Sequence, residues 1–349
     1  MKTLRPDREL GSLATHRGFL GRPCLKGPVA PFPCRPGDVY RQQVAGLAKR
    51  LKAIRCRDVV VGLSGGLDSA LALLVCVGAF EKLRLDPAGI HVFTMPGFGT
   101  SGRTKGNAGF LCDGLGLALE TLPIGPSVRQ HLKLIGHDGR TPDVTYENAQ
   151  ARIRTLILMD KANMTGGIVI GTGDLSEIAL GWCTYNGDHM SMFAVNNDVP
   201  KTVVRRVCAW WADGAARRAA DPEKGLGLAA AAIRDIIATP VSPELVKGQV
   251  TEEKIGSYEL HDFFLWNFIV NEMGPDDLRR SAESFFGGRF PSEEIARTLK
   301  TFLHRFFTQA FKRNCQPDGV KVFPFELSLR GWWIPSDLGP VDFPTVKMV

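Results

Sequence analysis

The sequence has no hydrophobic run long enough to cross a bilayer. Its longest uninterrupted apolar stretch is Ala70 to Phe80, whereas a membrane-spanning helix needs about 20 apolar residues. Residues 1–25 carry charges where a secretory signal needs an apolar block. The absence of both features predicts a soluble, cytoplasmic protein that has no membrane partner.

Paired cysteines and charge runs are missing as well. The 8 cysteines include no Cys-x-x-Cys pair, and Cys76 and Cys208 lie in apolar segments, so we expect free thiols. No five like charges occur in a row, and basic residues do not alternate with aromatic ones. The net charge of +7 therefore favours phosphorylated small molecules over nucleic acid as partners.

Apolar segments alternate with helical patterns along the first two thirds of the chain. Strands are expected at 59–63, 90–94, 119–124 and 168–172, and helices at 37–54, 69–83, 104–117 and 146–162. Strands that are apolar on both faces suit a parallel sheet covered by helices on both sides. The alternation predicts a doubly wound α/β domain.

The two ends of the chain differ from this pattern. Residues 1–37 are rich in Gly, Pro and Arg and read as an irregular leader or linker remnant. Beyond Pro240 the pattern is helical, most clearly over 260–268 and 295–311, and a Pro- and Trp-containing tail follows. We therefore divide the chain into a leader (1–37), an α/β core (38–245) and a helical C-terminal extension with the tail (246–349).

A glycine-rich turn, Ser64-Gly65-Gly66-Leu67-Asp68-Ser69, joins the first predicted strand to the next helix. At such a junction, backbone N–H groups and the helix dipole favour an anion, and glycines let the backbone approach it closely. The turn is neither a Walker loop nor a Gly-x-Gly-x-x-Gly fingerprint. A structural turn capped by Ser and Asp is the alternative interpretation.

The Ser-Gly-Gly-x-Asp-Ser pattern resembles the pyrophosphate loop of the N-type ATP pyrophosphatases, which cleave ATP to AMP and pyrophosphate. Blocks at 94–100, 143–154 and 171–201 resemble the NAD synthetase family, specifically the synthetase domain of its glutamine-dependent members. The resemblance covers about residues 38–337. It implies the PP-loop (adenine nucleotide alpha hydrolase-like) fold and a ligase that converts deamido-NAD to NAD.

The chemistry of that reaction needs an activated carboxyl group. A carboxylate is a poor electrophile, so ATP first converts it to a mixed anhydride with AMP, and ammonia then displaces AMP. The resemblance implies that Asp68 and Glu177 hold Mg²⁺, which prefers carboxylate and phosphate oxygens. It also implies that Lys201 neutralises phosphate charge. The implied ATP-binding set is Ser64, Gly65, Gly66, Asp68, Ser69, Thr172 and Lys201.

Several implied residues have alternative structural roles. Thr172 lies at the carboxyl end of a predicted strand, and the family places a threonine near ATP there. A helix N-cap would explain Thr172 too, and Asp174 or Ser176 could equally cap that helix. Asp188 matches a family aspartate near the dinucleotide and the ammonia site. Its alternative is a solvated turn residue. His189 beside it lacks a third ligand at regular spacing, so we reject a metal pair there.

The resemblance assigns the deamido-NAD contacts to Asn148, Arg152, Asp188 and Lys312. Asn148 and Arg152 stand four residues apart and share one helix face, which a solvated surface would explain as well. Lys312 belongs to a basic loop over the nucleotides or to an ordinary cationic helix end. For His261, packing within an apolar helix is slightly favoured over a place in the active site.

Two other functions compete with the main hypothesis. One is another adenylating amidotransferase, such as a GMP-synthetase-like enzyme, and the other is a non-catalytic nucleotide-binding subunit. Residues 1–37 are too few for a glutaminase domain, and Cys24 and Cys34 lack a scaffold to orient a base. We therefore expect use of free ammonia, unless a glutaminase domain or subunit is supplied. The family implies a homodimer or higher homo-oligomer.

Overall fold

The computed structural model describes residues 31–100, 102–242, 245, 251–328 and 331. Its strands form one five-stranded sheet in the order β3-β2-β1-β4-β5, and every pair is parallel. In this sheet Val59 lies opposite both Ile90 and Ile168. The strands are β1 (Val59–Gly62), β2 (Ile90–Thr94), β3 (Leu119–Thr121), β4 (Ile168–Gly171) and β5 (Phe193–Ala194). The four predicted strands are confirmed, and β5 is an addition.

The strand order places a topological switch between β1 and β4. The chain runs outward from β1 through β2 to β3, then returns to β4 beside β1 and continues outward to β5. In open α/β sheets, ligands bind in the crevice at the carboxyl ends of the strands where the order reverses. The fold therefore directs attention to the segments that follow β1 and β4.

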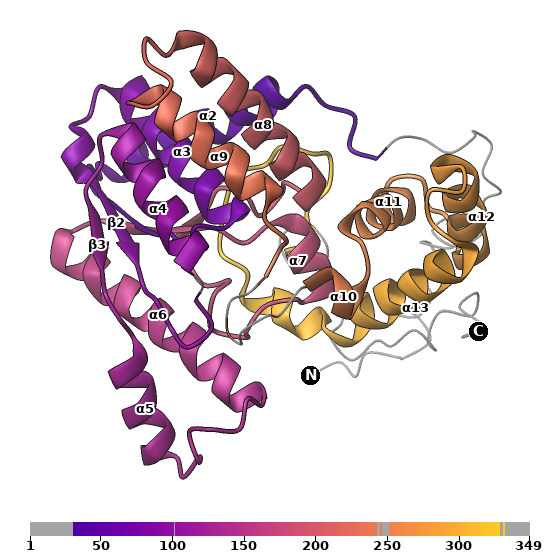
Figure 1. Ribbon diagram of the computed structural model, residues 1–349. Helices are drawn as coiled ribbons and strands as arrows, with labels where there is room; N and C mark the ends of the chain where they lie inside the picture. Colours follow the sequence, from indigo (N-terminus) through magenta and orange to yellow (C-terminus); the bar gives the residue numbers. More distant parts are fainter. Residues whose placement is uncertain (1–30, 101, 243–244, 246–250, 329–330, 332–349) are drawn as a thin grey trace, which may run out of the picture.

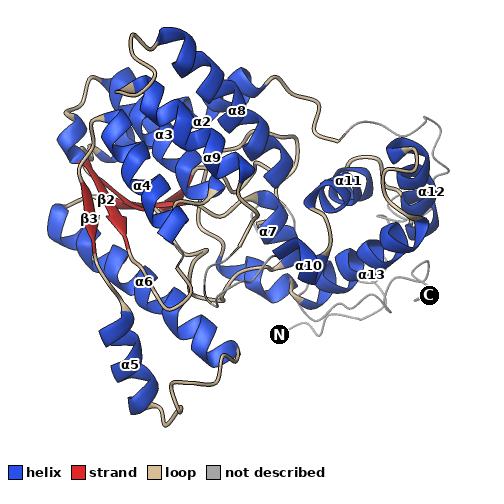
Figure 2. Ribbon diagram, viewed as in Figure 1, coloured by secondary structure: helices blue, strands red, loops and turns tan. Residues whose placement is uncertain are grey.

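Helices cover both faces of the sheet (Figures 1 and 2), which confirms the doubly wound fold class. Alternation along β1 and β2 explains the two layers, because Val61 and Val92 join the large core whereas Val60 and Phe93 pack with Ala162 of α6. One face carries α2 (Pro36–Ile54), α3 (Leu67–Leu83), α4 (Gly102–Leu115), α8 (Lys201–Arg218) and α9 (Leu226–Ala238), and the other carries α6 (Val144–Thr165), on which α5 (Gly125–Leu134) packs.

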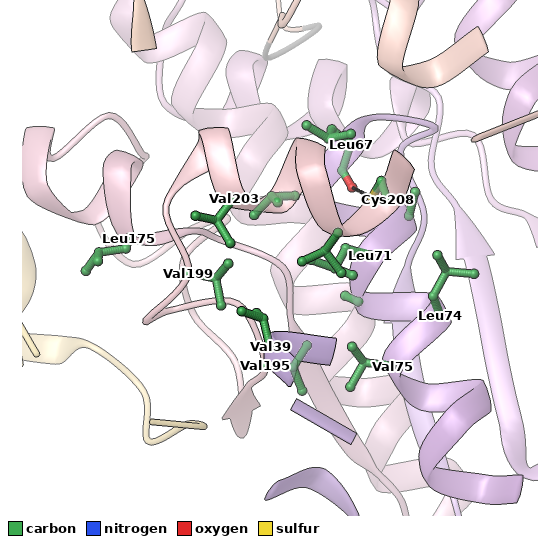
Figure 3. Packing of buried hydrophobic residues seen from close by; sticks show 14 of the residues in the cluster. Val39, Leu67, Leu71, Leu74, Val75, Leu175, Val195, Val199, Val203 and Cys208 are labelled. Carbon is green, nitrogen blue, oxygen red and sulfur yellow. Dashed lines mark hydrogen bonds between the residues drawn. The ribbon is translucent and has the colours of Figure 1, made fainter. Parts of the chain in front are cut away.

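The central helix α3 is apolar on nearly all sides because it is enclosed. Figure 3 shows Leu71, Leu74 and Val75 of this helix among side chains that come from α2, from α8 and from the segment that follows β5. The side chains of Leu71, Leu74 and Val75 are fully buried. Each such side chain contributes about 1.5–3 kcal/mol by leaving water. Helix α3, which begins at the glycine-rich turn, is thus fixed by the core.

The C-terminal part is helical, as expected. It contains α10 (Thr251–Ile255), α11 (Tyr258–Ile269), α12 (Pro275–Phe286), α13 (Ser292–Thr308) and the 3-10 segment η3 (Ala310–Cys315), and the short helix α7 (Leu175–Leu180) lies between these helices and α8. Phe302 of α13 and Val61 of the sheet belong to one buried cluster, so this extension shares the core of the α/β part.

Some predictions fall on residues outside the described set. The predicted leader is described only from residue 31, Cys24 lies outside, and of the tail beyond 328 only Gly331 is described. The predicted boundary at 245/246 lies where only Leu245 is described between residues 242 and 251. The seven described cysteines are free, as expected. In the described ranges no helix has both the length and the apolar character to span a membrane.

His261 of α11 makes the stability of the fold depend on pH. The ring is buried, its Nε2 lies 2.9 Å from the Ile255 carbonyl oxygen, and burial lowers the pKa of His261 to about 4. An unfolded histidine titrates near 6.5. From pH 6.5 down to 4 the unfolded chain thus binds a proton that the folded protein refuses, and the free energy of unfolding falls by up to about 1.4 kcal/mol per pH unit.

We therefore expect the wild type to lose stability between pH 7 and pH 5, whereas His261→Gln, which keeps a donor for Ile255, loses distinctly less. Urea unfolding of both proteins at the two pH values measures this difference. Equal losses for the two proteins would assign the pH dependence to other groups.

Candidate functional site

A cavity of about 260 Å³ opens at the carboxyl ends of the strands, next to the switch point. It is bounded by the turn after β1, by the end of β2 and by the segment after β4. Eight of the residues proposed from the sequence line it, namely Ser64, Gly65, Gly66, Asp68, Ser69, Thr172, Glu177 and Asp188. The crevice expected from the strand order therefore coincides with the glycine-rich turn.

The turn 64–69 is held by its own side chains. The Ser64 Oγ accepts a hydrogen bond from the Gly66 N–H (3.1 Å), and the Ser69 Oγ accepts one from the Ser64 N–H (3.2 Å). The Ser69 hydroxyl donates in turn to the Gly66 carbonyl oxygen (3.1 Å). No side chain caps α3, which begins after Gly66. Its first N–H groups are thus free to bind an anion in the cavity.

A buried lysine and three carboxylates meet beneath this turn. The Lys201 Nζ lies 2.5 Å from Asp68 Oδ2, 2.7 Å from Asp174 Oδ2 and 2.9 Å from Glu177 Oε1. Lys201 and Asp174 are almost fully buried, whereas the side chains of Asp68 and Glu177 are 19% and 20% exposed and reach the cavity. Lys201 itself does not line the cavity. It contacts the acids from the protein side.

Three carboxylates around one ammonium leave the cluster with excess negative charge. Burial, together with the charge of Asp68, raises the pKa of Glu177 to about 7 despite the opposing effect of Lys201. Burial likewise raises the pKa of Asp174. Burial lowers the pKa of Lys201, but the three carboxylates outweigh it and hold that pKa well above its usual range. Lys201 is therefore held in its protonated form, and the raised carboxyl pKa values indicate that the cluster favours additional positive charge, as a proton or as a bound cation.

The carboxylates also fit a divalent cation. One oxygen of each of Asp68, Asp174 and Glu177 lies within 4.8 Å of the other two, the one such group among the described residues. The Asp68 Oδ1 is buried and has no hydrogen-bond partner there, which is costly unless another ligand satisfies it. Hard oxygen donors of this kind suit Mg²⁺. These residues could thus hold the magnesium that the family resemblance implies.

Asp174 belongs to the site, although the sequence predicts it only as one of three possible caps of the following helix. It precedes α7 and accepts a hydrogen bond from the Glu177 N–H (2.9 Å), so Asp174, rather than Thr172 or Ser176, caps this helix. Its other oxygen contacts Lys201. A single aspartate thus fixes the start of α7, and with it Glu177, relative to the lysine.

The remaining predicted residues gather around the loop 181–190 that follows α7. Asn148 accepts a hydrogen bond from the Thr184 Oγ (2.7 Å), and Arg152 donates to the Tyr185 carbonyl oxygen through two nitrogens (both 3.3 Å). Asp188 accepts one from the Thr184 N–H (2.7 Å) and lines the cavity.

Lys312 holds the same loop from the C-terminal side, where its Nζ donates to the carbonyl oxygens of Gly181 (2.9 Å) and Cys183 (2.7 Å). Asn148, Arg152 and Lys312 do not line the cavity. Asp188 belongs to this loop and also lines the cavity, so it connects the residues around the loop 181–190 with those that line the cavity.

His189 and His261 lie outside the charged cluster. The His189 Nδ1 lies 2.9 Å from the Thr184 carbonyl oxygen and its Nε2 lies 3.2 Å from the Cys315 Sγ. No metal-binding group that includes His189 occurs among the described residues. His261 is buried within α11, as the packing interpretation has it.

Gly65 offers a direct test of the loop geometry. Its φ is +86°, and an added Cβ would stand 2.1 Å from the Thr104 carbonyl oxygen. Gly66 has φ −91°, and its Cβ would meet only the Ser64 Oγ, at 3.2 Å. We expect Gly65→Ala to lower the free energy of unfolding by about 2–4 kcal/mol, because strain at positive φ and overpacking add.

The matched change Gly66→Ala should lower the free energy of unfolding by less than about 1 kcal/mol. Urea unfolding of the three proteins measures both values. Equal stability of the two variants would contradict the described conformation of the loop.

Comparison with known proteins agrees with this geometry. Residues 39–289 match the family model described as NAD synthase. The glutamine-dependent NAD(+) synthetase of Mycobacterium leprae is 37% identical over 331 residues, which covers 86% of this chain and 48% of the relative. The chain thus spans about half the length of the curated relatives it matches.

Two solved structures share the fold. A glutamine-dependent NAD(+) synthetase from Cytophaga hutchinsonii aligns over 86% of this chain and 54% of its own, with a TM-score of 0.64 and 18% identity. An NH3-dependent NAD synthetase from Campylobacter jejuni aligns over 74% of this chain and 98% of its own, with a TM-score of 0.52 and 21% identity. Since the family model spans most of the chain and includes the turn 64–69, Asp174, Glu177 and Lys201, this protein belongs to the NAD synthase family.

Proposed function

We propose that this chain is an NAD synthetase, which adenylates the nicotinate carboxylate of deamido-NAD with ATP and then amidates it with ammonia to give NAD, AMP and pyrophosphate. The observation that carries the proposal is the convergence of an anion-binding turn with Asp68, Glu177 and Lys201 inside the family match. The same arrangement opposes a degenerate, non-catalytic subunit, because each charged group of the motif is present and in contact.

The turn 64–69 is suited to the pyrophosphate that leaves ATP. The uncapped N–H groups at the start of α3 donate hydrogen bonds to phosphate oxygens. The hydrogen bond between the Ser64 and Ser69 hydroxyls (3.0 Å) holds the turn in the shape that presents these groups. Thr172 approaches from the neighbouring strand end and contacts the nucleotide in this proposal. A loop that is already formed needs no rearrangement when charge develops on the departing group.

Asp68, Asp174 and Glu177 would hold Mg²⁺, which neutralises phosphate charge when bound. Lys201 holds the acidic side chains together from beneath, so they do not repel one another apart before the nucleotide binds. Its fixed positive charge also lies close behind the anion-binding turn, where it favours the developing charge on the pyrophosphate.

The loop 181–190 would receive the dinucleotide. Asn148, Arg152 and Lys312 all bond to this loop, and Asp188 extends from it into the cavity. In the proposal Arg152 and Lys312 attract the diphosphate of deamido-NAD, and Asp188 lies next to the reacting carboxylate and ammonia. A carboxylate there can accept a proton from the attacking ammonia.

We further propose free ammonia as the nucleophile of this chain. In support, its fold covers 98% of a structure named as an NH3-dependent NAD synthetase. A glutaminase domain or subunit would supply the ammonia where glutamine is the source. A cytoplasmic, homo-oligomeric enzyme is part of the same proposal.

The decisive assay combines the purified chain with ATP, Mg²⁺, deamido-NAD and ammonium chloride and follows NAD, AMP and pyrophosphate. We expect equal amounts of all three. Asp68→Asn and Glu177→Gln should each lower pyrophosphate release at least about a hundredfold, because charge leaves the metal site with little change in volume.

The other outcomes identify the competitors. Adenylation of a different carbonyl substrate without NAD formation would favour another adenylating amidotransferase, and nucleotide binding without turnover would favour a binding subunit. A parallel reaction with glutamine in place of ammonium should give no NAD. Wild-type turnover by either variant would refute the assignment of the carboxylates.

Arg152 separates dinucleotide binding from ATP binding. Arg152→Ala removes a charge-assisted contact worth about 1.5–3 kcal/mol, so the KM for deamido-NAD should rise about tenfold or more while the KM for ATP changes less than about twofold. Arg297→Ala, at an exposed position of α13, is the matched control and should change neither value. A parallel rise of both KM values in Arg152→Ala would contradict the proposed role.

A further inference from the structure

A buried amide connects the two sides of the switch point. Asn196 follows β5, is fully buried and does not line the cavity. Its Nδ2 donates to the Asp68 carbonyl oxygen (2.9 Å) and to the Thr172 carbonyl oxygen (3.0 Å). One acceptor belongs to the first turn of α3, next to the pyrophosphate turn, and the other follows β4. The amide thus spans the gap between β1 and β4 where the proposed nucleotide site opens.

The orientation of this amide is determined by its neighbours. Both of its acceptors are carbonyl oxygens, so the Nδ2 must face them and the Oδ1 must face away. The Oδ1 accepts from the Gln43 Nε2 (2.9 Å), which also donates to the Val195 carbonyl oxygen (2.9 Å). Gln43 lies on α2 and is fully buried. A chain of buried hydrogen bonds of this kind specifies one arrangement.

The segment that carries Asn196 is itself anchored. Val195 and Val199 point into the core beside α2 and α3 (Figure 3) and are fully buried. Asp198 accepts from the N–H groups of Val322 (2.5 Å) and Phe323 (2.7 Å). The side chain of Asn196 therefore extends from a rigid backbone, and Lys201 follows it within the same short segment.

We propose that Asn196 is a positioning residue for the nucleotide site, oriented by Gln43, which sets the distance between the backbone of Asp68 and that of Thr172. From outside the cavity it holds Asp68, at the proposed metal site, and Thr172, at the proposed ATP site, in one geometry. The inference rests on the proposed function in one respect, which is the choice of pyrophosphate release as the reaction to measure. The contacts themselves belong to the fold.

The test compares Asn196→Ala with Asn267→Ala. Asn267 of α11 is equally buried, and its Nδ2 donates to the Phe263 carbonyl oxygen (2.9 Å) away from the cavity. Both variants lose a buried amide, so both lose stability. In Asn196→Ala we also expect kcat for pyrophosphate release to fall about tenfold to a hundredfold, as for other residues that orient groups at a metal site. The dissociation constant for deamido-NAD should change less than about twofold.

Gln43→Met is a milder variant, which keeps the length of the side chain and removes the donor to Asn196. We expect a loss of about twofold to tenfold in kcat, the effect of one neutral hydrogen bond, and no added loss when it is combined with Asn196→Ala. This variant keeps the proposal testable if Asn196→Ala does not fold.

Calorimetry with ATP and Mg²⁺ makes the test independent of turnover. If the wild type binds magnesium and ATP but forms no NAD, the proposed function fails, and weaker nucleotide binding by Asn196→Ala than by Asn267→Ala still supports the positioning role. If Asn196→Ala and Gln43→Met lose only stability, with wild-type kcat and wild-type affinity for the nucleotide, Asn196 has no positioning role and the inference is overturned.

Discussion

The contact of Lys201 with three carboxylates is the interaction on which the rest of the site depends. An ammonium and three acids taken out of water carry a desolvation cost of several kcal/mol each, and only close mutual contact offsets it. The groups come from the first turn of α3, from the turn after β4, from α7 and from the first residue of α8. The contacts of Lys201 with the three carboxylates therefore fix the relative positions of these four elements.

The helices beyond the sheet stabilise the same contact. The carboxylate of Asp262 on α11 accepts hydrogen bonds from the Ser176 hydroxyl and from the N–H of Thr202 (2.9 Å). The Ser176 Oγ in turn accepts from the Lys201 N–H (2.8 Å). The Tyr258 ring lies 5.2 Å from the lysine ammonium. The C-terminal extension thus supports the starts of α7 and α8, so the charged cluster is a product of both parts of the chain.

Sequence periodicity predicts the elements whose burial is one-sided or complete over several residues. β1, β2 and β4 begin where they are expected, since their β-branched runs lie in the middle of the sheet. β5 has two residues and leaves no pattern. α8 and α9 lie outside the predicted helices, although Val203, Val207 and Trp211 recur at helical spacing in α8 and an alanine-rich run marks α9.

The family resemblance implies Asp68, Glu177 and Lys201, and the structure brings these three together. Asp174 is harder to assign, because a capping aspartate and a cluster aspartate have the same local sequence and only the distance to Lys201 distinguishes them. Asn196 has no local signal at all. Its partners are distant in sequence and are backbone carbonyls, which every residue possesses. Such residues become visible only when the chain is folded.

Two of the hydrogen bonds that hold the loop before α8 can form only late in protein synthesis. The two N–H groups that bind the Asp198 carboxylate belong to residues 322 and 323, and the edge of β5 pairs with Gly319. A nascent chain that has been translated only through α8 already contains the lysine and the three carboxylates of the charged cluster. It still lacks residues 322 and 323, which hold the loop before α8 through Asp198. These hydrogen bonds to Asp198 can therefore form only after the sheet and its covering helices have been translated.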